Sequence, residues 1–322
     1  MATCWNPNSR AFSDPEISNL DSQAQAQQLL RRPHVVIATP GRLAALLESD
    51  PALRRAFRGA RFLVLDEADR LLEPSFEKDL AVLLDAIPER QRRTLLFSAT
   101  MTQSLEELRS LMLQDAYYFT AYEGLRTAER LREQFVLVPQ KVKEVYLAHL
   151  LGRLEEWGVR SAIIFAGTCQ ACRQLEALLQ ELEVRAVSLH SKKSQSERLT
   201  ALERFKSSQV PLLVATDVAS RGLDIPTVDL VLNYDLPKLA QDYVHRVGRT
   251  ARAGKGGWSL SLVTQYDISL VHKIEALTNK QLEPFDLVES EVLKDITRVF
   301  KAKRAAMMQL AEHEVRQKDK RR

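Results

Sequence analysis

Short apolar runs that alternate with helical segments are the feature of this sequence that most restricts its fold. In the second half of the chain, six such runs read as buried strands, and segments with helical spacing fall between most of them. Apolar strands separated by helices form a parallel sheet with helices on both faces, which is an α/β fold. The expected strands are 134–138, 161–165, 184–189, 212–215, 230–233 and 258–263, and the expected helices lie near 143–157, 172–183, 194–206 and 239–246.

The first half shows the same alternation with fewer strands. Half of a doubly wound sheet leaves an edge and inner faces without cover, so this part is expected to be unstable alone. The expected strands are 34–39, 61–65, 93–97 and a short one at 117–120, and the expected helices are 21–32, 41–47, 77–86 and 105–113. This pattern predicts five segments along the chain: a flexible segment at 1–20, a partial first domain at 21–122, a linker at 123–133, a second domain at 134–290 and a basic helical tail at 291–322.

Bulk properties exclude several classes of protein. A length of 322 residues suggests two domains, and 45% hydrophobic with 27% charged residues is typical of soluble globular proteins. No run of 18 apolar residues predicts a membrane span, and the first residues do not resemble a secretory signal. Three cysteines in a long chain favour a reducing compartment over a disulfide scaffold.

The positive charge is concentrated in the tail. The whole chain carries a net charge of +4, and the segment from Glu291 to Arg322 carries ten basic and five acidic residues, so the rest is close to neutral. A basic tail attracts polyanions such as RNA. A solvated helix face explains the same charges equally well.

Three acidic residues follow an apolar strand at Asp66, Glu67 and Asp69. In a phosphoryl-transfer enzyme, the first carboxylate at such a strand end holds Mg²⁺ and the second orients the attacking water. A cluster of capping carboxylates in a loop is the structural alternative. The phosphate-binding sequence G-x-x-x-x-G-K-[ST] does not occur in the 322 residues.

Hydroxyl groups follow two other expected strands. Ser98 and Thr100 come directly after the strand at 93–97 and can hydrogen-bond the carboxylates, although Ser and Thr after a strand are also common helix caps. The turn from Thr39 to Arg42 combines a hydroxyl, backbone N–H groups at a helix start and an arginine. This combination favours an anion such as a nucleic-acid phosphate, and a plain strand-to-helix turn is the alternative.

Two stretches in the second half carry stronger signals. The segment 215–226 offers hydroxyls, Gly222 for a tight backbone, and Asp224 between two apolar residues, a setting that suits a ribose hydroxyl. In the segment 245–254, Arg246, Arg249 and Arg252 stand three residues apart, which places them along one face of a helix. Arginine favours bidentate phosphate contacts, and a ladder of structural salt bridges is the alternative.

Cysteines and histidines give weaker signals. Cys169 and Cys172 have C-x-x-C spacing at the start of an apolar helix, and without a second pair we interpret them as packed thiols rather than a redox or zinc site. Cys4 is expected to be inert. The six histidines show no metal-ligand spacing, and only His245 is assigned a function.

Together these segments resemble a DEAD-box RNA helicase, from about Asp21 to at least Glu289. The resemblance rests on five motifs in order: T-P-G-R at 39–42, V-L-D-E-A-D at 64–69, S-A-T at 98–100, A-T-D-V-A-S-R-G-L-D-I-P at 215–226 and H-R-V-G-R-T-A-R at 245–252. His245 at the start of the last motif separates the chain from DEAH helicases. The stretch 261–268 further resembles a nucleolar branch of the family that is linked to pre-ribosomal RNA.

The resemblance implies two RecA-like domains, the first truncated at its N-terminus, with ATP between them and single-stranded RNA across their top. It implies a monomer in the nucleus and nucleolus that acts on pre-ribosomal RNA, with pre-ribosomal proteins as further partners and no membrane association. The implied roles are Mg²⁺ binding by Asp66, activation of water by Glu67, coupling of ATP to RNA by Asp69, Ser98, Thr100 and His245, ribose contact by Asp224, γ-phosphate contact by Arg249 and Arg252, and RNA backbone contact by Thr39, Gly41, Arg42 and Thr216.

The chain departs from the family pattern in two places. Ala251 stands where the family usually has Gly, a small change that we expect to be tolerated. The adenine-reading segment, the phosphate-binding loop and the first RNA-contacting motif would precede Asp21, where only about twenty dissimilar residues stand, so we expect tight ATP binding to be lost. Three hypotheses remain: a truncated or alternatively spliced ATP-dependent RNA helicase, an RNA-binding protein that acts without ATP, and a different nucleotide-dependent enzyme on a doubly wound fold.

Overall fold

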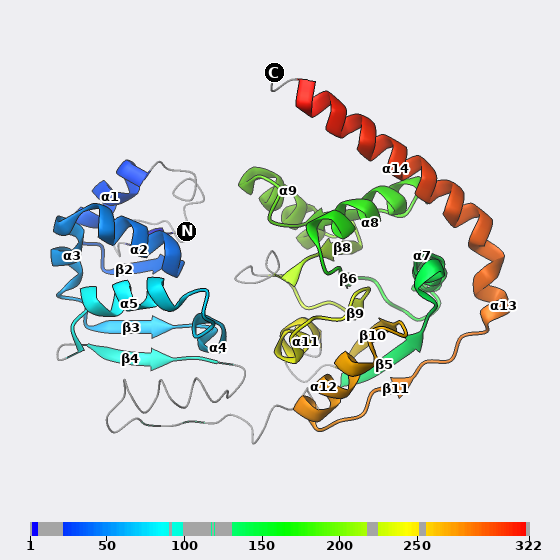
Figure 1. The fold of residues 1–322 in the computed structure, drawn as a ribbon, viewed down its shortest axis with the longest axis horizontal. Helices are drawn as coiled ribbons and strands as arrows, with labels where there is room; N and C mark the ends of the chain where they lie inside the picture. Colours follow the sequence, from blue (N-terminus) through cyan, green and yellow to red (C-terminus); the bar gives the residue numbers. More distant parts are fainter. Residues whose placement is uncertain are drawn as a thin grey trace. The chain divides into compact units, whose positions relative to one another are not determined.

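A computed structural model describes residues 2–5, 22–89, 92–98, 117, 119, 131–217, 225–250 and 256–319. The chain divides into two compact units, residues 1–120 and 121–322, and each is described by itself (Figure 1). Three predicted site residues, Thr100, Asp224 and Arg252, lie outside the described residues. The helix expected at 105–113 and half of the strand expected at 117–120 lie outside them as well.

The first unit contains two pairs of strands. Strand β2 (Val35–Ala38) pairs antiparallel with β1 (Ala2–Trp5), and β3 (Phe62–Leu65) pairs in parallel with β4 (Arg93–Leu96). Four helices, α1 (Ser22–Leu30), α2 (Pro40–Ser49), α3 (Pro51–Phe57) and α5 (Glu77–Ala86), contribute leucines to its main apolar cluster. Asp50 caps α3, because its Oδ1 accepts a hydrogen bond from the Ala52 N–H at 2.7 Å. The short α4 (Ala68–Leu71) follows β3 directly.

One face of these strands is buried and the other is exposed. Along β2, Val36 and Ala38 pack against the helical cluster, whereas Ile37 between them is 66% exposed. Phe62 and Val64 in β3 are 59% and 54% exposed, and Leu95 and Phe97 at β4 are exposed in the same way. Parallel sheets normally have both faces covered. Among the described residues, this unit therefore exposes several apolar side chains on one face of its strands.

The second unit is built on a parallel sheet of seven strands in the order β11-β5-β10-β9-β6-β8-β7. Six of these strands are close to the predicted ones, and the seventh, β11, is a two-residue edge strand that the sequence did not indicate. The sheet joins segments that are far apart in the sequence, because β5 pairs with β10 along seven residues. The strands are β5 (Leu131–Leu137), β6 (Ala162–Phe165), β7 (Ala186–Leu189), β8 (Leu212–Ala215), β9 (Leu230–Asn233), β10 (Gly257–Val263) and β11 (Glu283–Pro284).

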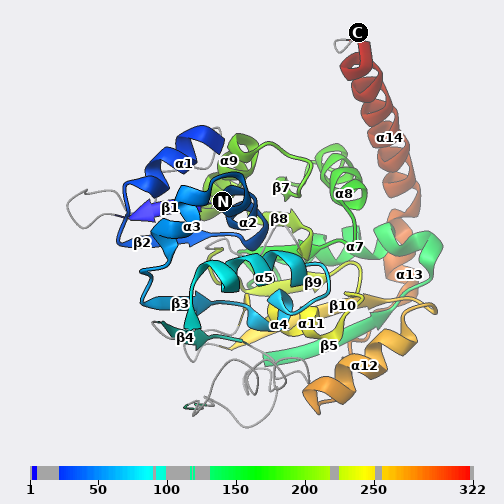
Figure 2. The same cartoon turned by 60° about the vertical axis from the view of Figure 1, so that its left-hand side comes forward.

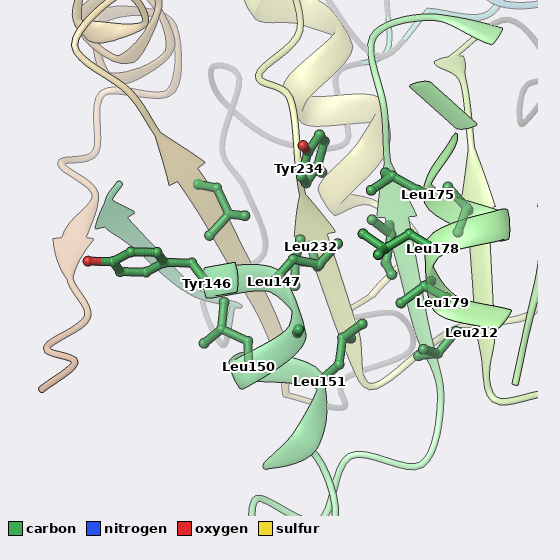
Figure 3. Packing of buried hydrophobic residues seen from close by; sticks show 14 of the residues in the cluster. Tyr146, Leu147, Leu150, Leu151, Leu175, Leu178, Leu179, Leu212, Leu232 and Tyr234 are labelled. Atoms are coloured by element: carbon green, nitrogen blue, oxygen red, sulfur yellow. The ribbon is translucent and has the colours of Figure 1, made fainter. Parts of the chain in front are cut away.

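Helices cover both faces of this sheet. In β6, Ala162 and Ile164 join the cluster formed with α7 (Lys143–Gly152) and α8 (Cys169–Glu181), whereas Ile163 and Phe165 join the cluster on the other face with α9 (Gln195–Lys206). Figure 3 shows leucines of α7 and α8 directed toward residues of β8 and β9 in the first cluster. A third cluster packs α11 (Ala240–Val247) and α12 (Ile268–Thr278) against the sheet. This double cover explains why all four residues of β6 are buried.

The tail forms a long helix that packs on the second unit. After the short helix α13 (Glu289–Val292), α14 (Ile296–Asp319) runs along α8, as Figure 2 shows. Val299 and Ala306 of α14 are buried, and Lys303 pairs with Glu144 of α7 at 2.6 Å. The predicted basic tail is therefore a helix with one packed face. Among the described residues, no helix is long and apolar enough to cross a membrane.

Several local predictions differ from the structure. Residues 1–20 were expected to be flexible, but Ala2–Trp5 form β1, because the edge of β2 offers backbone partners to a segment too short to show a period. Helix α7 ends at Gly152 rather than 157, and β5 starts at Leu131 inside the segment expected to be a linker. Helices α3, α4 and α12 were not predicted.

Candidate functional site

The acidic motif forms a tight tip at the end of β3. Glu67 adopts a left-handed backbone conformation with φ 51° and ψ 48°, which is uncommon for a residue with a side chain and is often found at functional sites. The N–H of Phe97 donates to the carbonyl of Leu65 and the N–H of Ala68 donates to the carbonyl of Phe97, both at 2.9 Å. These two bonds fix the tip against the end of β4, so Ser98, the next residue, lies beside the acidic turn.

The three carboxylates of this tip differ in exposure. Asp66 is exposed and its Oδ1 accepts the N–H of Glu67 at 3.0 Å, whereas Glu67 and Asp69 are half-buried. Mg²⁺ usually binds one or two protein carboxylates and keeps several waters or substrate phosphates. Asp66 fits that role as a single exposed ligand. Within the described ranges no group of three or more His, Cys, Asp or Glu residues forms a complete metal site.

The predicted anion site at Thr39, Gly41 and Arg42 has an acidic neighbour. Thr39 caps α2 by position without a side-chain capping bond, and Arg42 Nε donates to Gln25 Oε1 at 2.7 Å. A Cβ atom added at Gly41 would stand 3.0 Å from Asp79 Oδ2 of α5. This carboxylate makes the start of α2 less favourable for a phosphate than the sequence alone suggested.

In the second unit, Arg246 joins the ends of three strands. Its side chain is 2% exposed, and it donates through Nε and Nη2 to the two carboxylate oxygens of Asp217 at 2.6 and 2.8 Å. Nη1 donates to Asn233 Oδ1 at 3.0 Å and to the carbonyl oxygen of Asp235 at 2.5 Å. The guanidinium also lies over the Phe165 ring, 4.9 Å from its centroid. This arginine therefore holds the carboxyl ends of β6, β8 and β9 in fixed positions.

Asp235 extends this network to the next elements. Its Oδ1 accepts a hydrogen bond from Lys143 Nζ and its Oδ2 accepts one from the Gly167 N–H, both at 2.9 Å. Lys143 is buried on α7, and Gly167 lies in the turn between β6 and α8. Asp235, which follows β9, therefore links the carboxyl ends of the strands to α7 through Lys143 and to the turn after β6 through Gly167.

Two arginines of the last motif, Arg246 and Arg249, do not lie along one helix, and Arg252 lies outside the described residues. Helix α11 ends at Val247 with Gly248 as its C-cap, so the predicted helical face is wrong beyond Arg246. Arg249 lies in the following turn, where its N–H donates to the Arg246 carbonyl and its own carbonyl accepts the Val228 N–H, both at 3.0 Å. The salt-bridge interpretation holds for Arg246, whereas Arg249 and His245 are half-buried.

Two buried polar side chains at the carboxyl ends of β7 and β8 have no hydrogen-bond partner among the described residues. They are the Thr216 hydroxyl and both ring nitrogens of His190. The two residues are neighbours, because the Thr216 N–H donates to the Leu189 carbonyl at 3.2 Å. Burial, and then the charge of Lys193, lower the pKa of His190 below the usual value for histidine. Thr216 was predicted as a site residue, whereas His190 was not, because its burial cannot be read from its sequence context.

The two cysteines lie in the first turn of α8, as predicted. Thr168 caps this helix by accepting the Ala171 N–H at 3.0 Å. Cys172 is fully buried in the core, and Cys169 is half-buried with its Sγ 3.3 Å from Ser191 Oγ. Both thiols are free.

Comparison with known proteins places these groups in a family. Residues 9–108 match the family described as DEAD/DEAH box helicase, and residues 142–254 match the helicase conserved C-terminal domain. The first match begins at residue 9, so the resemblance extends further toward the N-terminus than the motifs alone indicated.

Curated relatives and solved structures agree with these matches. The chain is 53% identical over 297 residues to DEAD-box ATP-dependent RNA helicase 36 of Oryza sativa subsp. japonica, covering 92% of this chain and 59% of the relative. It is 48% identical over 301 residues to the probable ATP-dependent RNA helicase DDX49 of Homo sapiens, covering 91% and 61%. The structure of Mss116p bound to single-stranded RNA and AMP-PNP aligns with a TM-score of 0.72 and 30% identity, covering 87% of this chain and 58% of that one.

These relatives are longer than the chain, which spans about 60% of their length. The family matches nevertheless cover both units, and the acidic tip and the Arg246 network lie inside the matched residues. The chain, whose two units each contain residues that match a helicase family model, belongs to the DEAD-box ATP-dependent RNA helicase family.

Proposed function

We propose that the protein is an ATP-dependent RNA helicase that couples ATP hydrolysis to the remodelling of RNA duplexes. Its family membership and the activity named for its relatives support this proposal. We further propose pre-ribosomal RNA as the substrate, with pre-ribosomal proteins as partners, in the nucleolus of the nucleus. This finer assignment is supported only by the resemblance of residues 261–268 to a nucleolar branch.

The first unit carries acidic residues for the nucleotide chemistry. Asp66 would hold Mg²⁺, which when bound neutralises the charge of the phosphates. Glu67 orients and activates the attacking water, and the rigid left-handed tip supports this role by fixing its backbone. Asp69, Ser98 and Thr100 transmit the nucleotide state to RNA.

The second unit carries basic residues for the nucleotide chemistry. Arg249 and Arg252 contact the γ-phosphate, His245 belongs to the coupling network, and Asp224 contacts the ribose. The two backbone hydrogen bonds at Arg249 support its role. They hold the backbone from which the guanidinium extends, and a phosphate-binding side chain needs a well-positioned backbone.

The single observation that carries the RNA-binding part is the Thr216 hydroxyl. A buried hydroxyl without a partner costs free energy unless a ligand supplies the missing bond. A phosphate oxygen of the RNA backbone accepts such a bond without reading sequence. Thr39, Gly41 and Arg42 make backbone contacts from the first unit, with Asp79 limiting how closely a phosphate approaches Gly41.

The phosphate-binding sequence G-x-x-x-x-G-K-[ST] is not among the 322 residues. Several N–H donors, a lysine charge and a Mg²⁺-ligating hydroxyl come from that loop. Each hydrogen bond to a charged group contributes about 1.5–3 kcal/mol. We therefore propose that the 322-residue polypeptide, assayed by itself, does not hydrolyse ATP and binds RNA without it.

An ATPase assay tests the impairment of the isolated chain. RNA-stimulated phosphate release should equal that of the Glu67→Gln variant, and turnover that this substitution abolishes would refute the impairment while supporting the Glu67 role. A fluorescent ATP analogue, titrated with and without RNA, separates the remaining alternatives. Tight binding of the analogue would favour the enzyme interpretation of this chain, and RNA binding without it would favour the ATP-independent one.

An RNA-binding assay tests the contact at Thr216. Thr216→Val keeps the shape and removes the hydroxyl, so affinity for single-stranded RNA should fall by about tenfold, the value of a hydrogen bond to a charged acceptor. The stability of the variant should not fall, because the hydroxyl has no partner among the described residues. Thr200→Val, at an exposed position on α9, is the matched control. Equal RNA affinity of Thr216→Val and the control would exclude this contact.

A further inference from the structure

The first turn of α8 places two thiols of very different character within one helical turn. Cys169 is its first residue and is half-buried, whereas Cys172, three residues later, is fully buried. We propose that Cys169 and Cys172 form a redox-active dithiol that closes to a disulfide by exchange with a low-molecular-weight disulfide. Their arrangement, and not the C-x-x-C spacing alone, carries this proposal.

The surroundings of Cys169 favour a thiolate. Its Sγ lies 3.3 Å from the Oγ of Ser191, a residue that follows β7. Cys169 also stands at the N-terminus of α8, a helix of 13 residues. Burial raises its pKa, but hydrogen bonds from Ser191 and the backbone of Lys192, with the Lys192 charge, outweigh burial and lower it. A thiolate at a helix N-terminus with hydrogen-bond donors is the attacking group of known dithiol sites.

Cys172 has the opposite environment. Burial, and then the negative groups around it, raise its pKa to about 12, so it remains a protonated thiol at neutral pH. It is therefore unreactive toward reagents in solution and can act only on a sulfur held next to it. A half-buried nucleophile and a fully buried resolving thiol in the same helical turn provide the division of roles that a dithiol exchange needs.

The distance between the two positions permits the bond. Residues three apart on a helix have Cβ atoms about 5–6 Å apart, and a disulfide needs roughly 3.5–4.5 Å. The first turn must tighten by about an ångström, which is feasible because the first N–H groups of a helix have no intrahelical partner. A zinc site is disfavoured, because no third ligand joins the pair within the described ranges.

The exchange balances atoms and electrons in two steps. The Cys169 thiolate attacks one sulfur of the small disulfide, breaking its S–S bond and releasing one thiolate, which takes up a proton. Cys172 then loses its proton, its sulfur attacks the Cys169 sulfur, and the second thiolate leaves and is protonated. Two electrons pass from the cysteines to the small disulfide, which ends as two thiols.

Peptide mapping of the full chain after treatment with oxidised glutathione tests the proposal. Trypsin cleaves after Arg160 and Arg173, so both thiols lie on one peptide, while Cys4 lies on another and serves as an internal reference. We expect the 161–173 peptide to lose two hydrogen atoms in most molecules, and the Cys172→Ala variant to retain glutathione on Cys169. A stable glutathione adduct on Cys169 in the unaltered chain, without the internal bond, would overturn the proposal.

Alkylation kinetics give a second measurement that requires no core substitution. At neutral pH, Cys169 should react roughly a hundredfold faster than Cys172, because the thiolate is the reacting form. Ser191→Ala should slow the alkylation of Cys169, and Ser196→Ala, at an exposed position on α9, should leave it unchanged. Equal rates at the two cysteines, or no effect of Ser191→Ala, would contradict the assigned roles.

Discussion

Arg246 donates two hydrogen bonds to the carboxylate of Asp217, at 2.6 and 2.8 Å, from a position that is almost fully buried. The residues lie 29 positions apart and belong to two different sequence motifs. Their bidentate contact connects the turn that follows β8 with the helix that precedes Arg249. The position of the proposed phosphate-binding arginine is thereby tied to the strand end that carries Thr216.

Removing the Arg246 side chain should destabilise the second unit strongly. Arg246→Ala removes two hydrogen bonds to Asp217 and one to Asn233, and breaking a buried pair by removing one partner costs about 3–5 kcal/mol. Urea unfolding measures the loss. The control is Arg153→Ala, whose ion pair with Glu156 is exposed and should contribute less than about 1 kcal/mol. Similar losses in both variants would show that the Arg246 network is not structural.

His190 should make stability depend on pH. Because burial lowers its pKa in the folded state, the unfolded chain binds a proton more readily below the ordinary histidine pKa, and stability falls as the pH decreases. Lys193 and Arg173 act in the same direction, and Glu176 and Glu197 oppose them. The free energy of unfolding should decrease between about pH 7.5 and about pH 5.5.

The variant His190→Gln should show a smaller decrease over that pH range. A residual slope is expected, because burial also lowers the pKa of His149. Thr200→Val, at an exposed position on α9, is the control and should leave the slope unchanged, because it adds and removes no titratable group. A slope in His190→Gln as steep as in the unaltered chain would contradict the role of His190.

The first unit should not unfold cooperatively when it is produced alone. Its strands expose Ile37, Phe62 and Val64. When helices cover only one face of the strands, too little apolar surface is buried for a stable domain. Residues 1–122 should melt broadly in calorimetry and bind a hydrophobic dye. A sharp, reversible transition at high temperature would show that this unit is complete by itself.

The packing of α14 should contribute measurably to the stability of the second unit. Val299 is fully buried against the sheet cluster, and burying a valine side chain contributes about 1.5–3 kcal/mol. Val299→Ala should lose most of this contribution in urea unfolding. Lys301→Ala, on the exposed side of the same helix, should change stability by less than about 0.5 kcal/mol. Equal stability of the two variants would indicate that α14 is not docked in solution.

Strands were predicted well where burial on both faces produces a continuous apolar run. Strands β6, β8 and β9 are examples, because every residue in them is buried. The short edge strand β11 was missed, since two residues show no period. Helix α12 was also missed, although Asp267 before it is the kind of residue that begins a helix.

The Arg246 network could not have been predicted from local pattern. Three arginines at helical spacing suggested one face, and nothing in that spacing shows that α11 ends at Val247 or that Asp217 reaches the first arginine. The burial of His190 and the closeness of Asp79 to Gly41 depend in the same way on tertiary contacts. Residue type and spacing predicted the motifs, whereas the partners of each side chain required the fold.

The pairing of β5 with β10 has a consequence for biosynthesis. Trp258 Nε1 on β10 donates to Gln134 Oε1 on β5 at 3.1 Å, and 124 positions separate them. At a synthesis rate of about 5–20 residues per second, a nascent chain carries β5 for roughly 6–25 s before its neighbour emerges from the ribosome. During that interval β5, with its apolar residues Leu131, Phe135, Val136 and Leu137, has no native partner strand, so a chaperone that shields it should raise the yield of folded protein.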